Sequence, residues 1–507
     1  MNYHSTRNSS VSVSSAQAIS QGISSEGGLF VPEKLPCFSY SDLLEFQHCG
    51  YTERAVRILS AFLSDFTAEE ITECVGKAYT GGKFEQDMPA PISCLQNGKM
   101  NMYLLELWHG PTCAFKDMAL QLLPHLLTKS LKKIQSSRTA LILVATSGDT
   151  GKAALEGFKD VDGTRIQVFY PENGVSPMQK RQMNTQEGNN VAVCAIEGNF
   201  DDAQTGVKKI FTDPEINRLL EQNNIMFSSA NSINWGRLLP QIVYYFSAYC
   251  DLMANGEIDR EGEKVNIVVP TGNFGNILAA YYAKKMGLPV KKLICASNAN
   301  NVLTDFLNTG VYDRNRDFHT TISPSMDILV SSNLERLLYD LTGNDSARVA
   351  GWMKELASGG RYQVDGDILN RLHELFCAGF CDDAATKETI REIYRTENYL
   401  CDTHTAVAVN VYQQYVEAEK DTETPTIVVS TASPYKFADN VLSAVSADYS
   451  ADASEFEKVQ ALSAVTGTPI PAPIVQLESK KVRFTAICPK DKMNEAVLKT
   501  AGIKYTV

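Results

Sequence analysis

The stretch that decides the fold reads Trp108-His109-Gly110-Pro111-Thr112-Cys113-Ala114-Phe115-Lys116-Asp117-Met118-Ala119-Leu120-Gln121. Its single lysine, Lys116, follows apolar or weakly polar residues, so the side chain is expected to be partly desolvated. Desolvation disfavours the ammonium form and lowers the pKa of a lysine, which makes the free amine available to condense with a carbonyl group. The motif therefore predicts a reactive amine, and a lysine that snorkels into water is the ordinary alternative.

The segments on either side of Lys116 predict a strand followed by a helix. Residues 102–107 are mostly apolar and end at the turn-forming pair Gly110-Pro111, which is typical of a buried strand. After Lys116, apolar residues recur at helical spacing at Ala119, Leu122, Leu123, Leu126 and Leu127. Lys116 is thus expected at a strand-to-helix junction, where active-site groups are often presented.

The run His-Gly-Pro-Thr-x-Ala-Phe-Lys-Asp at residues 109–117 resembles the cofactor-lysine motif of the threonine synthases, pyridoxal phosphate enzymes of the tryptophan synthase β fold group. Further matches extend from Tyr3 to about Phe437 and include residues 3–7 and 27–32, so we expect an ordered N-terminal arm. The resemblance implies that Lys116 binds pyridoxal 5'-phosphate. It also implies an α/β fold of the fold type II class, with open, mainly parallel sheets and helical additions at both ends.

Composition limits the class of protein. With 507 residues, 44% of them hydrophobic, the chain is expected to be globular and to form two or three domains. A net charge of −12 argues against a nucleic-acid surface, although a pocket for a small anion stays open. The absence of a membrane-spanning apolar run and of a secretory signal predicts a cytoplasmic protein with no membrane partner. The 12 cysteines should then be reduced thiols, and we expect no metal site.

After Lys116, short apolar segments alternate with helical patterns. The expected strands are 141–146, 166–170, 191–196, 225–227, 266–269, 293–296 and 426–430. This alternation predicts a mainly parallel, open sheet, on which ligands bind beyond the carboxyl ends of the strands. The polar and glycine-rich segments of the chain follow those ends.

Four parts of the chain are expected. They are an N-terminal arm and helical domain (1–95), an α/β domain with the lysine and the substrate loops (96–245), a second α/β domain (246–450) and a C-terminal extension (451–507). The second α/β domain contains a mostly helical stretch at about 308–424, which we interpret as an insertion.

The first polar loop is Thr146-Ser147-Gly148-Asp149-Thr150-Gly151-Lys152. Backbone N–H groups at a helix start suit a carboxylate or phosphate, and a plain helix cap is the alternative. The spacing fits neither a nucleotide-triphosphate loop nor a hydrolase elbow. The loop is similar to the Ser-Gly-Asp-Thr-Gly loop of threonine synthases, which implies that Ser147 and Thr150 hold the substrate carboxylate and that Asp149 lies near the cofactor.

The second polar loop runs from Val268 to Asn276 and contains Gly272-Asn273-Phe274-Gly275-Asn276. Its glycines permit close backbone approach, but the dinucleotide fingerprint is absent because Phe274 stands where the second glycine should be. The loop resembles the threonine synthase segment that binds the cofactor phosphate. The resemblance thus implies that Gly272, Asn273, Phe274, Gly275 and Asn276 contact pyridoxal phosphate.

The third polar segment, residues 229–237, places a hydroxyl, amides and one guanidinium before an apolar helix. Such groups suit a dianionic phosphate, which a guanidinium can bind through two hydrogen bonds. A capped helix start with a surface arginine explains the residues equally well. Threonine synthases have a similar run at the substrate phosphate, which implies this role for Ser232, Asn234 and Arg237.

The fourth segment, residues 430–437, follows a buried strand. Its hydroxyl at Thr431 is expected to bond the pyridine nitrogen of the cofactor, and Ser433-Pro434 suits the start of a helix. Two other runs, Ser323–Ile328 and Asp402–Ala406, also resemble family segments. We interpret the first as a segment that closes over the site, and we expect a structural role for His404.

Together the resemblances imply a carbon–oxygen lyase that converts O-phospho-L-homoserine and water to L-threonine and phosphate. Phosphate would leave the γ-carbon and water would add at the β-carbon, with Lys116 as general base and acid. One alternative is a threonine-synthase-like phospho-lyase that releases a keto acid. Another is a non-catalytic descendant that binds a metabolite or a protein, although the retained Lys116 and the four loops speak against it. Monomer and homodimer both stay open.

Overall fold

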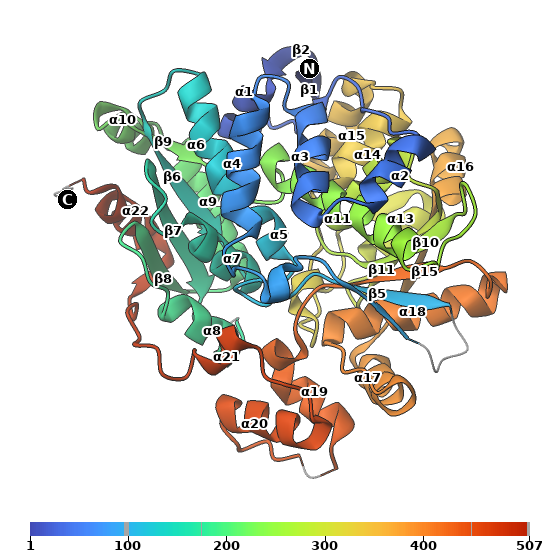
Figure 1. Cartoon of the computed structure of the whole chain (residues 1–507). Coiled ribbons are helices and arrows are strands. Elements are labelled where there is room, and N and C mark those ends of the chain that lie inside the picture. Colours follow the sequence, from blue (N-terminus) through green and yellow to red (C-terminus); the bar gives the residue numbers. More distant parts are fainter. Residues whose placement is uncertain (96–100, 174, 448, 504–507) are drawn as a thin grey trace.

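The structure, a computed structural model, describes residues 1–95, 101–173, 175–447 and 449–503. Two open sheets form its centre, one of five strands and one of six, and helices cover them (Figure 1). All strand pairs in these two sheets are parallel except the pair at one edge of the six-stranded sheet. The predicted architecture of open, mainly parallel sheets is confirmed.

The six-stranded sheet draws its strands from distant parts of the chain. In spatial order they are β14 (Phe376–Phe380), β11 (Val290–Ser297), β10 (Val265–Pro270), β15 (Thr426–Ser430), β5 (Met102–Glu106) and the antiparallel β4 (Ile92–Cys94). The residues of β10, β15 and β5 are buried along their whole lengths, as expected for strands with both faces covered. The covering helices include α12 (Gly275–Lys285), α18 (Thr403–Glu419) and α11 (Trp235–Ala254).

The five-stranded sheet is entirely parallel. Its order is β16 (Ile487–Pro489), β8 (Val191–Glu197), β7 (Thr164–Pro171), β6 (Thr139–Ala145) and β9 (Ile225–Ser228). The helices of this half are α5 (Lys116–Leu120), α6 (Leu123–Lys133), α7 (Asp149–Phe158), α8 (Pro177–Asn184), α9 (Phe200–Thr212) and α10 (Pro214–Gln222). The predicted helix after Lys116 is therefore two helices.

The N-terminal arm is ordered, as expected. A small antiparallel sheet is formed by β1 (Asn2–Ser5), β2 (Asn8–Ser14) and β3 (Phe30–Pro32). Tyr3 of β1 is fully buried and its hydroxyl donates to the carbonyl of Phe62 at 3.0 Å, which ties the arm to the helices that follow. These elements are α1 (Ser15–Gln21), α2 (Tyr40–Gln47), α3 (Tyr51–Phe62), α4 (Ala68–Tyr79) and the 3-10 helix η1 (Glu85–Asp87).

The stretch at about 308–424 is mostly helical, but it also returns to the main sheet. Its last strand, β14, pairs in parallel with β11 and so forms one edge of the six-stranded sheet. The other elements in or next to this stretch are α13 (Val302–Thr309), β12 (Val311–Asp313), η2 (Pro324–Met326), α14 (Leu334–Leu341), α15 (Ser346–Gly359), β13 (Arg361–Gln363), α16 (Gly366–Leu375) and α17 (Asp383–Glu397).

The C-terminal residues wrap back to the five-stranded sheet. The chain passes through η3 (Pro434–Phe437), α19 (Ala438–Val445), α20 (Glu455–Thr466) and α21 (Ala472–Val475), and then reaches β16, η4 (Lys490–Lys492) and α22 (Met493–Ala501). In Figure 1 the red α22 lies beside β8, the strand next to the edge strand β16. Among the described residues, no helix is both long and apolar enough to cross a membrane.

Candidate active site

Lys116 lies where the six-stranded sheet meets the helices of the other half. It is the first residue of α5, so the predicted strand-to-helix junction is confirmed. The backbone N–H of Phe115 donates to the carbonyl of Thr431 at 2.8 Å, which ties the lysine segment to the carboxyl end of β15. The Lys116 amine donates to the hydroxyl of Ser325 at 3.1 Å and lies 3.7 Å from a carboxylate oxygen of Asp149.

The surroundings of Lys116 favour the neutral amine. Burial lowers the pKa of Lys116 to about 8; the positive charges of Lys436 and Arg237 act in the same direction, and the Asp149 carboxylate opposes them. At neutral pH a measurable fraction of the amine is therefore unprotonated. An amine in that state can attack a carbonyl carbon and can exchange protons near neutral pH.

Asp149 begins α7 and is the acidic centre of the site. One of its carboxylate oxygens lies 2.7 Å from the ammonium of Lys436 and accepts a hydrogen bond from the Gln179 amide at 3.0 Å. The other oxygen accepts from the Ser325 hydroxyl at 3.1 Å. Burial alone would raise the pKa of Asp149, but the charges of Lys436 and Lys116 outweigh it and hold the pKa well below its usual range. Asp149 is thus an anion beside the reactive amine.

The loop before α7 is held by hydrogen bonds between the Thr146 side chain and the backbone of the loop. The Thr146 hydroxyl accepts from the N–H groups of Gly148 and Gly151, both at 2.9 Å. Gly148 has a φ of +137°, and a Cβ there would lie 2.2 Å from the Gln179 side chain, so only glycine fits. Ser147 and Thr150 are partly exposed beside this turn, which leaves their hydroxyls accessible to a ligand.

The loop between β10 and α12 approaches the loop that carries Ser325 closely. Phe274 has a left-handed backbone with a φ of 60°, and α12 starts at the next residue with no capping side chain among the described residues. A Cβ on Gly272 would lie 2.7 Å from the carbonyl oxygen of Ser325, so this contact requires a glycine. The helix start therefore offers backbone donors to an anion.

Asn276 in the first turn of α12 is oriented by two tyrosines. The hydroxyls of Tyr244 and Tyr245 donate to its side-chain oxygen at 2.5 and 2.6 Å. Its amide nitrogen is buried and has no partner within the described part of the chain. A buried donor without an acceptor is costly, which indicates a site made for a polar ligand.

Two residues at the start of α11, Asn234 and Arg237, have different surroundings. The Asn234 side chain caps α11 through the N–H of Gly236 and donates to the carbonyls of Ile19 and Ser229, both at 3.0 Å. Arg237 is buried, donates to the carbonyl of Ala230 at 2.5 Å, and keeps one guanidinium nitrogen, Nε, without a partner in the described residues.

Arg237 is thus the member of the third segment best suited to an anion. Burial lowers the pKa of Arg237 to about 10, so the group remains charged at neutral pH. Ser232 lies partly exposed in the turn before the helix. The side chain of Asn234 is already engaged in structural hydrogen bonds, and its predicted substrate contact stays a prediction.

Thr431 lies one residue beyond the end of β15, buried near Lys116. Its carbonyl bonds the lysine segment, and no hydrogen bond is formed by its hydroxyl in the described residues. The neighbouring Ser433 accepts from the N–H of Tyr435 and so begins η3, as predicted. This places Lys436 of η3, which is fully buried, against Asp149 and within 3.0 Å of the Thr112 carbonyl.

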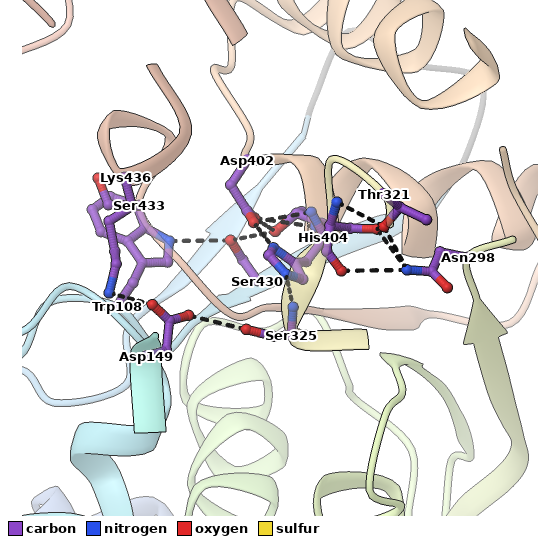
Figure 2. A network of polar contacts seen from close by, with 12 residues as sticks. Trp108, Asp149, Asn298, Thr321, Ser325, Asp402, His404, Ser430, Ser433 and Lys436 are labelled. Carbon is purple, nitrogen blue, oxygen red and sulfur yellow. Dashed lines mark hydrogen bonds and ion pairs between the residues drawn. The ribbon is translucent and has the colours of Figure 1, made fainter. Parts of the chain in front are cut away.

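A chain of polar contacts leads from this site into α18 (Figure 2). Asp402 bonds Nδ1 of His404 at 2.7 Å, and Nε2 of His404 accepts from the N–H of Ser325 at 3.2 Å. The sequence pointed to no function for Ser325, Lys436 or Gln179. The runs that contain Ser325 and Lys436 were recognisable as family segments, but only the folded chain brings these side chains to Asp149.

Three family models match the chain. One described as "Threonine synthase N terminus" covers residues 2–79, "Pyridoxal-phosphate dependent enzyme" covers 92–367, and "Threonine synthase, C-terminal" covers 405–497. The second match alone spans more than half of the chain. A chain with these sheets and this lysine site is a fold type II pyridoxal-phosphate-dependent enzyme, so the predicted fold class and cofactor are confirmed.

Known proteins make the assignment more specific. "Threonine synthase-like 1" of Homo sapiens is 42% identical over 440 residues, which is 85% of this chain, and the chain spans only 58% of that protein's length. "Threonine synthase" of Pseudomonas aeruginosa is 40% identical over 442 residues, 87% of this chain and 90% of that protein. The pyridoxal-phosphate-bound threonine synthase structure from Brucella melitensis is 36% identical, with a TM-score of 0.86 over 99% of both chains. The chain belongs to the threonine synthase family.

The matched ranges leave two sets of expectations open. The domain boundaries at 95, 245 and 450 stay a prediction, since a family match does not define where domains divide. The roles of the individual site residues also stay predictions.

Proposed function

We propose that this chain is a threonine synthase, a carbon–oxygen lyase that converts O-phospho-L-homoserine and water to L-threonine and phosphate. The observation that carries the proposal is a largely buried amine, Lys116, in the same site as a buried arginine whose Nε has no partner among the described residues. The amine suits the cofactor aldehyde, and the guanidinium suits a phosphorylated substrate. Membership of the threonine synthase family supports the specific reaction.

The residues present fit pyridoxal phosphate. Lys116 would bind it covalently, and the loop Gly272-Asn273-Phe274-Gly275-Asn276 would hold its phosphate at the start of α12. The buried amide nitrogen of Asn276, which has no partner among the described residues, supports this role. Asp149 would lie near its phenolic oxygen, and the Thr431 hydroxyl would bond its pyridine nitrogen. When bound, the cofactor supplies an electron sink for carbanionic chemistry.

The substrate would lie between the two remaining polar segments. Ser147 and Thr150 are proposed to bind its carboxylate at the start of α7, where backbone N–H groups add to the site. Arg237 and Ser232 are proposed to bind its phosphate. Asn234 is proposed to lie at the same phosphate site, and its side chain caps α11 and so orients the turn that carries Ser232.

Lys116 is proposed to move the protons of the reaction. Its pKa near 8 lets the amine take a proton from the α- or β-carbon of the substrate and return one at neutral pH. The buried ion pair with Lys436 keeps Asp149 ionised, so that a carboxylate anion lies beside the amine. Phosphate would then leave the γ-carbon towards Arg237, and water would add at the β-carbon.

Substitution of the lysine tests the proposal. Lys116→Ala should abolish the visible absorbance of bound cofactor and reduce turnover of phosphohomoserine by a factor of about 10³ or more, because anchor and base are both lost. Lys132→Ala, on an exposed position of the next helix, is the control and should retain both. An undiminished absorbance band in Lys116→Ala would refute the assignment.

A threonine-synthase-like phospho-lyase is the second candidate. It is kept because the human relative, 42% identical, carries a name that states a likeness to threonine synthase rather than the activity itself. Both candidates release phosphate from the same substrate. Amino-acid analysis of the product separates them, since L-threonine supports the first and a keto acid with ammonia supports the second. If neither product forms, a non-catalytic binding protein is favoured.

A further inference from the structure

Ser325 lies between Lys116 and Asp149, two of the charged groups of the site. Its hydroxyl accepts from the Lys116 amine and donates to Asp149, at 3.1 Å in both contacts. The direct distance from that amine to the carboxylate is 3.7 Å, too long for a hydrogen bond. Ser325 therefore links the amine to Asp149 through hydrogen bonds, in addition to the direct attraction between the two charges.

The loop that carries Ser325 is held by hydrogen bonds among its own polar residues and Asn298. The Asn298 amide at the end of β11 donates to the hydroxyl of Ser323 at 3.1 Å and to the carboxylate of Asp327 at 2.8 Å. The hydroxyl of Thr321 donates to the same carboxylate at 2.7 Å. These contacts lie on both sides of η2 and fix the short helix in place.

His404 supplies a second anchor, from α18. It is buried, and its Nδ1 bonds Asp402, a buried carboxylate that also caps the helix. Because a carboxylate only accepts, Nδ1 carries the hydrogen and Nε2 is left as an acceptor. That acceptor faces the N–H of Ser325 at 3.2 Å, which sets the orientation of the serine (Figure 2).

We propose that the Ser325 hydroxyl is a further functional residue, which orients the Lys116 amine and couples it to Asp149, and that His404, held by Asp402, is the positioning residue for Ser325. The inference rests on the proposed role of Lys116 as the cofactor-binding amine. The charged groups that act on Lys116 are Asp149 from α7, Lys436 from η3 and Arg237 from α11. Ser325 adds a neutral hydroxyl that accepts a hydrogen bond from the same amine.

The experiment measures uptake of pyridoxal 5'-phosphate by the full chain freed of cofactor, followed by visible absorbance across pH 6 to 10 without substrate. Uptake requires the unprotonated amine, so its midpoint reports the protonation of Lys116 in each variant. Ser325→Ala removes the hydrogen-bond acceptor of the ammonium. The midpoint should then fall by about one pH unit, because the protonated form loses its partner.

The positioning role of His404 is tested in the same assay. His404→Ala should shift the midpoint in the same direction by less, and His404→Gln should restore it, since the glutamine carbonyl can accept from the Ser325 N–H. His319→Ala, at an exposed histidine, and Ser358→Ala, on an exposed position of α15, should leave the midpoint unchanged. Circular dichroism confirms that each variant is folded.

The outcomes are distinct. An unchanged midpoint in Ser325→Ala overturns the role of the serine, and an unchanged midpoint in His404→Ala overturns the positioning role. Uptake with the expected shifts by an enzyme that makes no threonine would support this inference and contradict only the proposed reaction. No uptake by the unaltered chain would overturn both.

Discussion

At the scale of single residues, the most consequential contact is the buried pair of Lys436 with Asp149. The ammonium is fully buried and lies 2.7 Å from the carboxylate. In such a setting an ion pair adds little net stability compared with apolar residues, but removal of one partner leaves an uncompensated buried charge. Lys436 also lowers the pKa of Lys116. The same cation therefore stabilises the ionised Asp149 and favours the neutral form of the Lys116 amine.

Loss of this cation should be costly. We expect Lys436→Met to lower the free energy of unfolding by about 3 to 5 kcal/mol, because Asp149 keeps its charge without its closest partner. Urea denaturation of both proteins measures the difference. The matched control is Lys77→Met on α4, where an exposed pair with Glu73 should contribute less than about 1 kcal/mol. Equal effects at the two sites would contradict the assigned importance of the buried pair.

At the scale of elements, His109 joins the end of β5 to the N-terminal helices. Its Nε2 lies 2.7 Å from Glu106 of β5 and its Nδ1 lies 2.9 Å from Glu85 of η1. Burial would lower the pKa of His109, but the two carboxylates outweigh it and raise the pKa to about 9. The charged imidazolium therefore clamps two elements together, seven residues before Lys116 in the chain.

This clamp predicts a pH dependence of stability. Because the folded pKa of about 9 lies above the unfolded value of 6.5, the contribution of His109 is fully present below pH 6.5 and is lost as the pH rises through 9. The difference in unfolding free energy between the wild-type chain and His109→Gln should therefore shrink by about 3 kcal/mol at most from pH 6 to pH 10.

Urea denaturation at several pH values measures that difference. His48→Gln, at an exposed histidine, serves as the control and should show a constant offset from the wild-type chain. A constant offset for His109→Gln as well would show that the imidazolium does not hold the two elements together.

Most strands of the two main sheets could be predicted from the sequence, and a few could not. The strands β6, β7, β8, β10, β11 and β15 were predictable because each is a short apolar run bounded by polar residues. Strands such as β14 and β16 were not, because Phe376–Phe380 contains Gly379 and Ile487–Pro489 has only three residues. Lys116 and the glycine loops carry recognisable motifs. The contacts of Ser325, Gln179 and Lys436 with Asp149 depend on tertiary folding, which no local pattern encodes.

At the scale of the whole molecule, the C-terminal extension completes the five-stranded sheet. Its strand β16 pairs with β8, and α22 buries Met493, Val497 and Leu498 against the strands and helices of that half. A Cβ on Gly206 of α9 would lie 2.3 Å from the sulfur of Met493, so the helices pack closely. The extension therefore packs on one face of β6, the strand that leads to the loop at Asp149.

A single substitution in α22 tests this contribution. Leu498→Ala should lower the free energy of unfolding by about 2 to 4 kcal/mol, because it leaves a cavity in a buried cluster. Thermal or urea denaturation measures the effect, and Lys499→Ala at the exposed neighbouring position should be within about 0.5 kcal/mol of the wild type. A loss in Leu498→Ala no larger than in the control would mean that the extension is loosely attached.

The strand order of the six-stranded sheet has a consequence for biosynthesis. A ribosome synthesises β5 first, β10 later and β15 after both. In the folded sheet β15 lies between β10 and β5, and the residue after its carboxyl end bonds the segment of Lys116. Until β15 arrives, the facing edges of its two neighbours have unpaired backbone groups, the kind of surface that invites pairing with other nascent chains. Maturation of the catalytic centre thus waits for one of the last strands to be translated.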